Sequence, residues 1–389
     1  MSPEQLNRLK QAYKDIEGTA LVKTLDDVME TGHRAALSAA SSGIGLLRPE
    51  LAQLWEGIRD APSVQASVRA RGVAADGSIY GIHKYENFDP GWAEAGIKWL
   101  ENLHNRAPFS DQPAQIDLAD PIKIAVVGDW GAGPGTPAMQ VANLMQSIQP
   151  GCAIHLGDVY YAGSESEERE NFLNLWPFPD CSFALNSNHE MYSGARGYFN
   201  TLLGNPAFSR QKRCSYFAMT NKHWLLMGLD SAYDADANNL YLTGKLGTSQ
   251  LEFIKRTTET YGAGRKIMLF SHHEGLDING KETSLYAEVV GAIGRPPEFW
   301  YWGHLHAAIG YANHKGMFGR CVGHGAIPFG DIVSLKSKPF VEFYESQSAH
   351  DAHCPERVLN GYLALSIDGA RLTETFIAED GSTRFQKIH

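Results

Sequence analysis

Hydrophobic and polar positions divide the chain into two parts with different periodicities. Before about residue 107, apolar residues recur at helical spacing, and amphipathic helices are predicted in the segments 2–16, 49–58 and 89–103. Proline near the start of each segment suits the first turn of a helix. The segment Ala107–Pro121 then contains three prolines and several polar residues, and it is predicted to be a linker.

From residue 122 onward, short and almost wholly apolar runs alternate with helical stretches. The first runs, Ile122–Val127 and Cys152–Leu156, enclose a predicted helix over about 137–147, which is the size of a βαβ unit. Strands that are apolar on both faces are typical of a covered sheet, so an α/β fold is expected. Further strands and a C-terminal β-hairpin are predicted at Ser182–Leu185, Trp224–Leu229, Lys266–Phe270, Glu298–Trp302, and Gly361–Ile367 with Leu372–Ile377.

Composition and charge narrow the function classes. The chain has 389 residues and a formal net charge of −10, which disfavours non-specific binding to nucleic acid. It contains no run of eighteen apolar residues, so no transmembrane segment is expected. The first residues do not resemble a signal peptide, and the 5 cysteines are widely spaced. Free thiols and a cytoplasmic location are therefore expected, with pairing of Cys321 or Cys354 as the alternative.

Side chains that bind metals follow the predicted strands. Because ligands of open α/β sheets bind outside the carboxyl ends of the strands, these residues are expected to converge at one edge. The set offers oxygen and imidazole donors without a thiolate, which suits Fe, Mn or Zn. The residues are Asp129, Asp158, Asn188-His189-Glu190, His272-His273, His304 and His306.

Taken together, these motifs resemble those of the calcineurin-like metallophosphoesterase superfamily. The matching strings are Val127-Gly128-Asp129, Gly157-Asp158, Asn188-His189-Glu190, a strand ending at His272, and Gly303-His304-Leu305-His306. Gly131 stands where many members carry a histidine ligand, whereas Tyr161 stands three residues after Asp158, as in purple acid phosphatases. The resemblance covers about residues 122–330. It implies a four-layer α/β/β/α sandwich over residues 116–389, preceded by a mainly helical domain of unknown role over residues 1–115.

The resemblance also implies roles for individual residues. One metal would be held by Asp129, Asp158, Tyr161 and His306, and the second by Asp158, Asn188, His272 and His304. The implied pair is Fe(III) with Fe(II), Zn(II) or Mn(II), and His189 would contact the phosphoryl group and protonate the leaving oxygen. Tyr160 competes with Tyr161 and His273 with His272. Ser187 occupies the place of a usual glycine, and Glu274 that of a frequent proline.

The expected function is hydrolysis of a phosphoric ester, in which metal-bound hydroxide attacks phosphorus in line. A phosphodiesterase acting on a nucleotide or lipid head group, or a catalytically silent scaffold of the same fold, are the alternatives. The partner is then a phosphate-ester substrate. The apolar faces of the N-terminal helices are explained most simply by packing within the chain. A lid over the metals and a homo-oligomer interface are the more specific alternatives.

Overall fold

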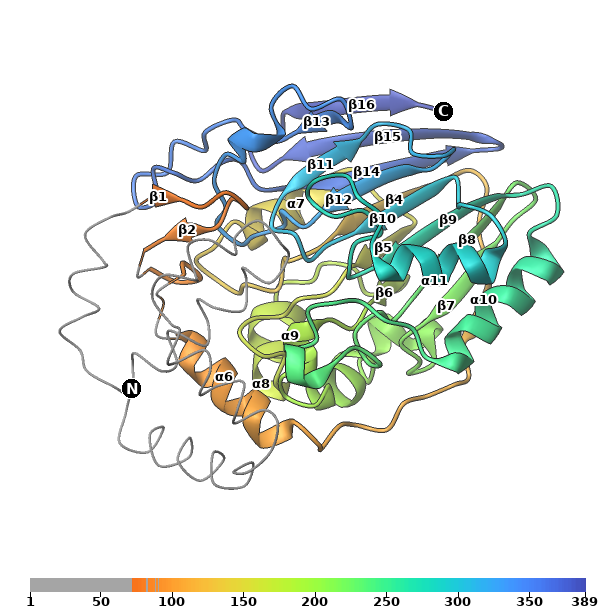
Figure 1. Ribbon diagram of the computed structural model, residues 1–389, viewed down its shortest axis with the longest axis horizontal. Coiled ribbons are helices and arrows are strands. Elements are labelled where there is room, and N and C mark those ends of the chain that lie inside the picture. Colours follow the sequence, from red (N-terminus) through yellow and green to blue (C-terminus); the bar gives the residue numbers. More distant parts are fainter. Residues whose placement is uncertain (1–71, 82, 88, 90) are drawn as a thin grey trace.

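Two β-sheets face one another in the middle of the molecule (Figure 1). The computed structural model describes residues 72–389 except 82, 88 and 90. One sheet has eight strands, in the order β13 (Val341–Tyr344), β11 (Ala308–Tyr311), β12 (Phe318–Val322), β10 (Phe299–Trp302), β9 (Lys266–Ser271), β8 (Trp224–Gly228), β7 (Phe217–Thr220) and β3 (Ala114–Asp117). The other has six, in the order β16 (Thr383–Ile388), β15 (Arg371–Ala378), β14 (Gly361–Asp368), β4 (Ile122–Val127), β5 (Cys152–His155) and β6 (Ser182–Ala184).

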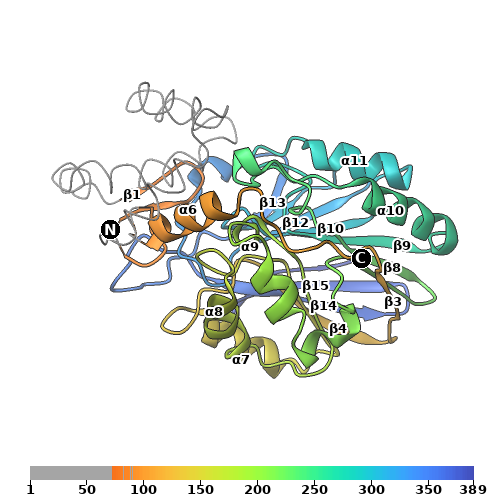
Figure 2. The same ribbon diagram turned by 90° about the horizontal axis from the view of Figure 1, so that it is seen from below.

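Helices cover the outer face of each sheet, which completes four layers (Figure 2). Outside the eight-stranded sheet lie α10 (Thr248–Tyr261) and α11 (Ser284–Ile293). Outside the six-stranded sheet lie α7 (Ala138–Ser147) and α8 (Glu165–Glu167), and α8 continues into a π-helical turn, Glu168–Leu173. The predicted α/β/β/α sandwich is therefore confirmed. Across the described ranges, no helix combines the length and apolar character that a membrane crossing requires.

The remaining short elements connect these layers. They are β1 (Gly72–Val73), β2 (Ile79–Tyr80), α6 (Gly91–Asn102), α9 (Asn188–Met191), a π-helical turn at Gly197–Leu202, and 3₁₀ turns at Pro206–Gln211, Ala237–Asn239 and Val333–Leu335. Helix α6 matches the third predicted amphipathic helix. The two helices predicted before residue 60 lie outside the described residues.

Strand β4 shows why the central strands are apolar throughout. Ile124 and Val126 face the core between the two sheets, whereas Ala125 and Val127 face the core beneath the outer helices. Successive side chains of a strand point to opposite faces, so a strand that separates two cores needs apolar residues at every position. The parallel pairing of β4 with β5 and of β5 with β6 then aligns their carboxyl ends at one edge.

Two sequence expectations about local structure were wrong. The predicted linker contains β3, which pairs in parallel with β7 at the edge of the larger sheet. Cys152 and Cys181 form a disulfide, although free thiols were expected. They stand at the beginning of β5 and directly before β6, and the parallel pairing of these strands brings the two residues together. Neither Cys321 nor Cys354 is part of a disulfide in the structure, so the alternative pairing is wrong as well.

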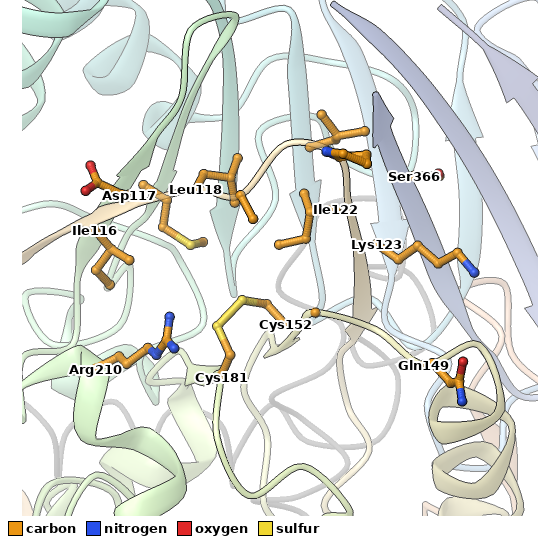
Figure 3. A pocket seen from close by; sticks show the side chains of 15 residues that line it. Ile116, Asp117, Leu118, Ile122, Lys123, Gln149, Cys152, Cys181, Arg210 and Ser366 are labelled. Atoms are coloured by element: carbon orange, nitrogen blue, oxygen red, sulfur yellow. A yellow bond between two sulfur atoms is a disulfide. The ribbon is translucent and has the colours of Figure 1, made fainter. Parts of the chain in front are cut away.

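The disulfide lines a cavity at the amino-terminal ends of the strands. Figure 3 shows Cys152 and Cys181 beside Ile122 and Leu118 in this cavity of about 550 Å³. Ile122 and Cys152 begin β4 and β5, so the cavity lies at the edge opposite the carboxyl ends of these strands. None of the predicted metal ligands lines it.

Candidate metal centre

Residues from both sheets meet where the strands end. The six-stranded sheet places Asp129, Asp158 and Asn188 after β4, β5 and β6, and the eight-stranded sheet places His272 after β9 and His304 and His306 after β10. Apart from His306, these side chains are buried. The predicted convergence at one edge is thus present in the structure: Asn188 begins helix α9, and the other residues lie in the loops that their strands lead into.

The backbone around these residues adopts conformations that are uncommon outside glycine. Asp129, Asp158 and His304 have φ angles of 55°, 75° and 65°. Such conformations cluster at functional sites, where the surrounding fold holds them. Gly157 has a φ of 103°, and a Cβ atom there would lie 2.8 Å from Nδ1 of His272. Glycine is therefore required directly before Asp158 so that the aspartate and the histidine can approach.

The first donor group consists of Asp129, Asp158, Tyr160 and His306. One oxygen or nitrogen atom from each of Asp129, Asp158 and His306 lies within 4.8 Å of the others. The Tyr160 hydroxyl lies 2.8 Å from Oδ2 of Asp158, 3.2 Å from Oδ1 of Asp129 and 3.0 Å from Nε2 of His306. A single hydroxyl proton serves only one of these acceptors at a time. The group therefore carries the excess of acceptor atoms that a cation needs.

The second donor group consists of Asp158, Asn188, His272 and His304. Nε2 of His272 lies 2.8 Å from Oδ1 of Asn188 and 3.3 Å from Oδ1 of Asp158. Asn188 uses its amide nitrogen to donate to the hydroxyl of Tyr192, which leaves Oδ1 facing the group. The ring of His304 lies 5.1 Å from that of His272 and 4.7 Å from that of His273, and one nitrogen atom from each of these three histidines lies within 4.8 Å of the others.

The hydrogen bonds of the two adjacent histidines distinguish their roles. Nδ1 of His272 faces the Leu156 carbonyl at 2.9 Å, so Nδ1 carries the proton and a neutral His272 presents its lone pair at Nε2. His273 has partners at both nitrogens, the Ser231 hydroxyl and the Tyr241 carbonyl, each at 2.8 Å. The geometry therefore favours His272, rather than His273, as a metal ligand.

Burial and charge set the protonation states of the centre. Burial, reinforced by the charge of Asp158, raises the pKa of Asp129 well above its usual range. Burial would also raise the pKa of Asp158, but the charge of a neighbouring His189 and the hydrogen bond from Ser187 oppose it, and that pKa lies well below its usual value. Burial lowers the pKa of His272 and of His304 and so favours neutral imidazole, the form that binds a metal.

The donor set fits a pair of cations. In the second group, the lone pair of a neutral His272 points at the oxygens of Asn188 and Asp158, so acceptor atoms face one another with no proton between them. Buried carboxylates are retained in proteins when they are paired with a cation or bind a metal. Asp158 offers Oδ2 to the first group and Oδ1 to the second, as a bridging ligand requires.

Tyr161, the predicted tyrosine ligand, lies outside both donor groups. Its hydroxyl donates to Oδ2 of Asp89, whereas the neighbouring Tyr160 occupies the place expected for it. Burial, together with the bond to Asp89, raises the pKa of Tyr161 well above its usual range, and burial with the charges of Asp129 and Asp158 does the same for Tyr160, so the positions of the two hydroxyls, and not their pKa values, distinguish them. The spacing from Asp158 did not identify the tyrosine that faces the centre, because both tyrosines belong to one tight loop.

His189 lies at the border of the two donor groups. It is in the first turn of α9, which begins after the N-cap Ser187, whose side chain accepts from the His189 backbone N–H at 3.1 Å. Nδ1 of His189 lies 2.6 Å from the Tyr161 carbonyl, and Nε2 lies 3.7 Å from Oδ2 of Asp158. The Ser187 hydroxyl also contacts Asp158 and Glu190, so the departure from glycine places a hydroxyl on the central aspartate.

Sequence reasoning missed three residues that contact the tyrosine loop. Tyr85, Asp89 and Trp92 precede the predicted catalytic domain and belong to no motif. The Tyr85 ring lies 4.8 Å from that of Tyr161, and the Trp92 ring lies 5.7 Å from that of His189. The only signal was the Asp89-Pro90 pair, which predicted the start of a helix.

Comparisons with known proteins give similarities of overall fold. No protein-family model matches the chain, and no curated protein matches it in sequence. A dimetal phosphatase from Danio rerio is similar in structure with a TM-score of 0.46 and 10% identity, covering 69% of this chain and 99% of that one. PhoD has a TM-score of 0.43 and 11% identity, covering 73% of this chain and 69% of that one.

A third similar structure is GAP50, the anchor in the inner membrane complex of Plasmodium. It has a TM-score of 0.44 and 11% identity, and the match covers 69% of this chain and 88% of that one. Since these TM-scores lie below 0.5, none of the similarities assigns a function to this chain.

Proposed function

We propose that this chain is a metal-dependent phosphoric ester hydrolase of the calcineurin-like metallophosphoesterase type, with a dinuclear centre like that of purple acid phosphatases. The observation that carries the proposal is the position of Asp158, which turns one carboxylate oxygen toward each donor group. A carboxylate in this position would contribute a ligand to each of two neighbouring ions. Sites with two metals stabilise both the attacking and the leaving oxygen of a displacement at phosphorus.

Each ion would have its own set of side chains. The first would be held by Asp129, Asp158, His306 and a tyrosine, and the second by Asp158, Asn188, His272 and His304. We assign the tyrosine as Tyr160, because its hydroxyl faces Asp129, Asp158 and His306. A phenolate is a hard anionic donor, so the first position suits Fe(III), with Fe(II), Zn(II) or Mn(II) as its neighbour. When bound, the two ions would lower the pKa of a water molecule and neutralise phosphoryl charge.

His189 would be the general acid of the reaction. The Tyr161 carbonyl keeps the proton on Nδ1, so Nε2 is the atom that faces Asp158 and the substrate position. As an imidazolium, His189 would give the proton on Nε2 to the leaving oxygen. A positioned general acid of this kind contributes about 10²–10⁴-fold to the rate.

The test combines elemental analysis with hydrolysis of simple esters. Protein loaded with Fe, Mn or Zn is assayed on p-nitrophenyl phosphate and bis(p-nitrophenyl) phosphate, which also shows whether monoesters or diesters are preferred. Asp158→Asn is expected to lose both metals and activity together. Asp117→Asn, on the exposed side of β3, is the matched control and retains both. Turnover by metal-stripped Asp158→Asn at the wild-type rate would overturn the proposal.

A further inference from the structure

The chain before β3 packs directly onto the proposed catalytic residues. We call residues 83–102, apart from residues 88 and 90, the cap segment. It contains Tyr85 and Asp89 and ends with helix α6. Tyr85, Asp89 and Trp92 are buried, and they belong to a part of the chain that carries no metallophosphoesterase motif. Figures 1 and 2 both show α6 on the side of the molecule where α8 and α9 lie.

Asp89 is the centre of the hydrogen bonding in the cap segment. Oδ2 accepts from the Tyr85 backbone N–H at 2.6 Å and from the Tyr161 hydroxyl, and Oδ1 accepts from the Gly91 N–H at 2.9 Å. The carboxylate therefore ties the cap segment to the loop that carries Tyr160 and Tyr161. Gly91 permits this approach, because a Cβ atom there would overlap the ring of Tyr161.

Tyr161 passes this restraint on to His189. Its carbonyl accepts the Nδ1 proton of His189 at 2.6 Å, while its ring packs edge-on against Trp92 at 4.9 Å. His189 also lies between Trp92 and Tyr192, whose ring centroids are 5.7 Å and 4.9 Å from its own. A displacement of Tyr161 would therefore move both the hydrogen-bond acceptor and the aromatic wall that orient this imidazole.

We propose that Asp89 is a positioning residue of the active site, which acts through Tyr161 to hold His189 with its proton on Nδ1 and with Nε2 facing the reacting phosphate. The inference rests on the proposed function and extends it to a segment outside the metallophosphoesterase-like part of the chain. The cap segment is then a component of the catalytic centre rather than a separate module. Asp89→Asn should impair proton donation and leave metal binding unchanged.

The first experiment compares two monoesters that differ in their need for an acid. Phenyl phosphate has a basic leaving group, whereas p-nitrophenyl phosphate releases a stable phenolate and needs little protonation. In the metal-loaded enzyme, Asp89→Asn is expected to lower kcat for phenyl phosphate by about 10- to 100-fold, because small misplacements of a catalytic group have effects of this size. For p-nitrophenyl phosphate the loss should be about threefold or less, and metal content should stay at the wild-type level.

Matched variants show whether Asp89 acts through Tyr161. Tyr161→Phe removes the hydroxyl but keeps the ring and the carbonyl, and adding Asp89→Asn to it should lower kcat no further than Asp89→Asn alone, since residues in one hydrogen-bond chain are not additive. Asp76→Asn is the control. This aspartate of the same N-terminal region bonds to Ser78 and contacts neither Tyr161 nor His189, so no change is expected.

A spectroscopic readout separates this inference from the proposed function. In zinc-loaded protein labelled with ¹⁵N-histidine, His189 should show a proton on Nδ1, and Asp89→Asn should reduce that tautomer, with His189→Gln assigning the signals. An unchanged tautomer with an equal loss on both esters, or a loss of metal in Asp89→Asn, overturns the role of Asp89. If the wild type does not hydrolyse either ester, the proposed function is wrong. The effect of Asp89→Asn on the His189 tautomer would still show whether the cap segment orients His189.

Discussion

Two adjacent tyrosines provide a direct test of the metal centre. Tyr160→Phe and Tyr161→Phe each remove one hydroxyl from the same loop, and both changes leave a ring of nearly the same volume. The Tyr160 hydroxyl is buried among Asp129, Asp158 and His306, whereas the Tyr161 hydroxyl bonds to Asp89 outside the donor groups. The two variants therefore differ in which hydroxyl is lost, and little else.

The size of the difference follows from the contacts. Changing a residue that only orients a metal ligand typically costs about 10- to 100-fold in metal affinity. Tyr160 would be a direct anionic ligand, so Tyr160→Phe should weaken binding at the first donor group by at least about 100-fold, or about 2.7 kcal/mol. Tyr161→Phe should leave the affinity within about threefold, because Asp89 still accepts from two backbone N–H groups.

The assay is a metal titration against a competing chelator, together with the visible absorption of iron-loaded protein. A tyrosinate–iron(III) charge-transfer band is expected in the wild type and in Tyr161→Phe, and it should be absent in Tyr160→Phe. If the band instead disappears only in Tyr161→Phe, the phenolate belongs to Tyr161 and the assignment of Tyr160 is wrong. A colourless protein that is replete with iron would remove the tyrosinate altogether.

Three further predictions concern histidines and the disulfide. His155 is buried without a hydrogen-bond partner, and burial lowers its pKa to about 3, so the stability it confers is present above pH 6.5 and is lost as the pH falls toward 3. His155→Phe should therefore flatten the pH dependence of urea unfolding over this range by about one proton, and an unchanged slope would show that His155 does not cause it. His272→Ala should release metal, whereas His273→Ala should mainly lower the melting temperature, and elemental analysis of both variants distinguishes these outcomes. Replacing Cys152 and Cys181 by serine should lower the free energy of unfolding by roughly 3–4 kcal/mol, given a loop of 29 residues, and dithiothreitol should affect only the wild type.

Regular elements with a strong apolar pattern were predictable from the sequence. The bounds of β4 agree with the prediction, and β14 and β15 form the predicted hairpin around Asp368-Gly369. Strand β3 was missed because it has only four residues at a sheet edge. Its short alternation of apolar and polar residues is a weaker signal than the prolines and polar residues around it, which indicate a loop. Short edge strands depend on their neighbours, which a local pattern does not contain.

The positions of the proposed metal ligands were predictable to the extent that these residues follow strands. Asp129, Asp158 and His304 lie in loops, and Asn188 begins a short helix, at positions that the preceding strands determine. The direction of a side chain within a loop is set by tertiary contacts, which explains the exchange of Tyr160 and Tyr161. The disulfide was missed for a related reason, because the proximity of Cys152 and Cys181 comes from strand pairing across 29 positions.

The division of the proposed metal ligands between the two sheets has a consequence for assembly. Asp129, Asp158 and Asn188 come from the six-stranded sheet, and His272, His304 and His306 come from the eight-stranded sheet. Ions bound between them would therefore cross-link the two sheets. Neither layer alone would supply all the ligands of either proposed ion, so metal binding would stabilise only the assembled sandwich. At a free concentration 100 times the dissociation constant, each such ion would add about 2.7 kcal/mol to the cohesion of the two halves.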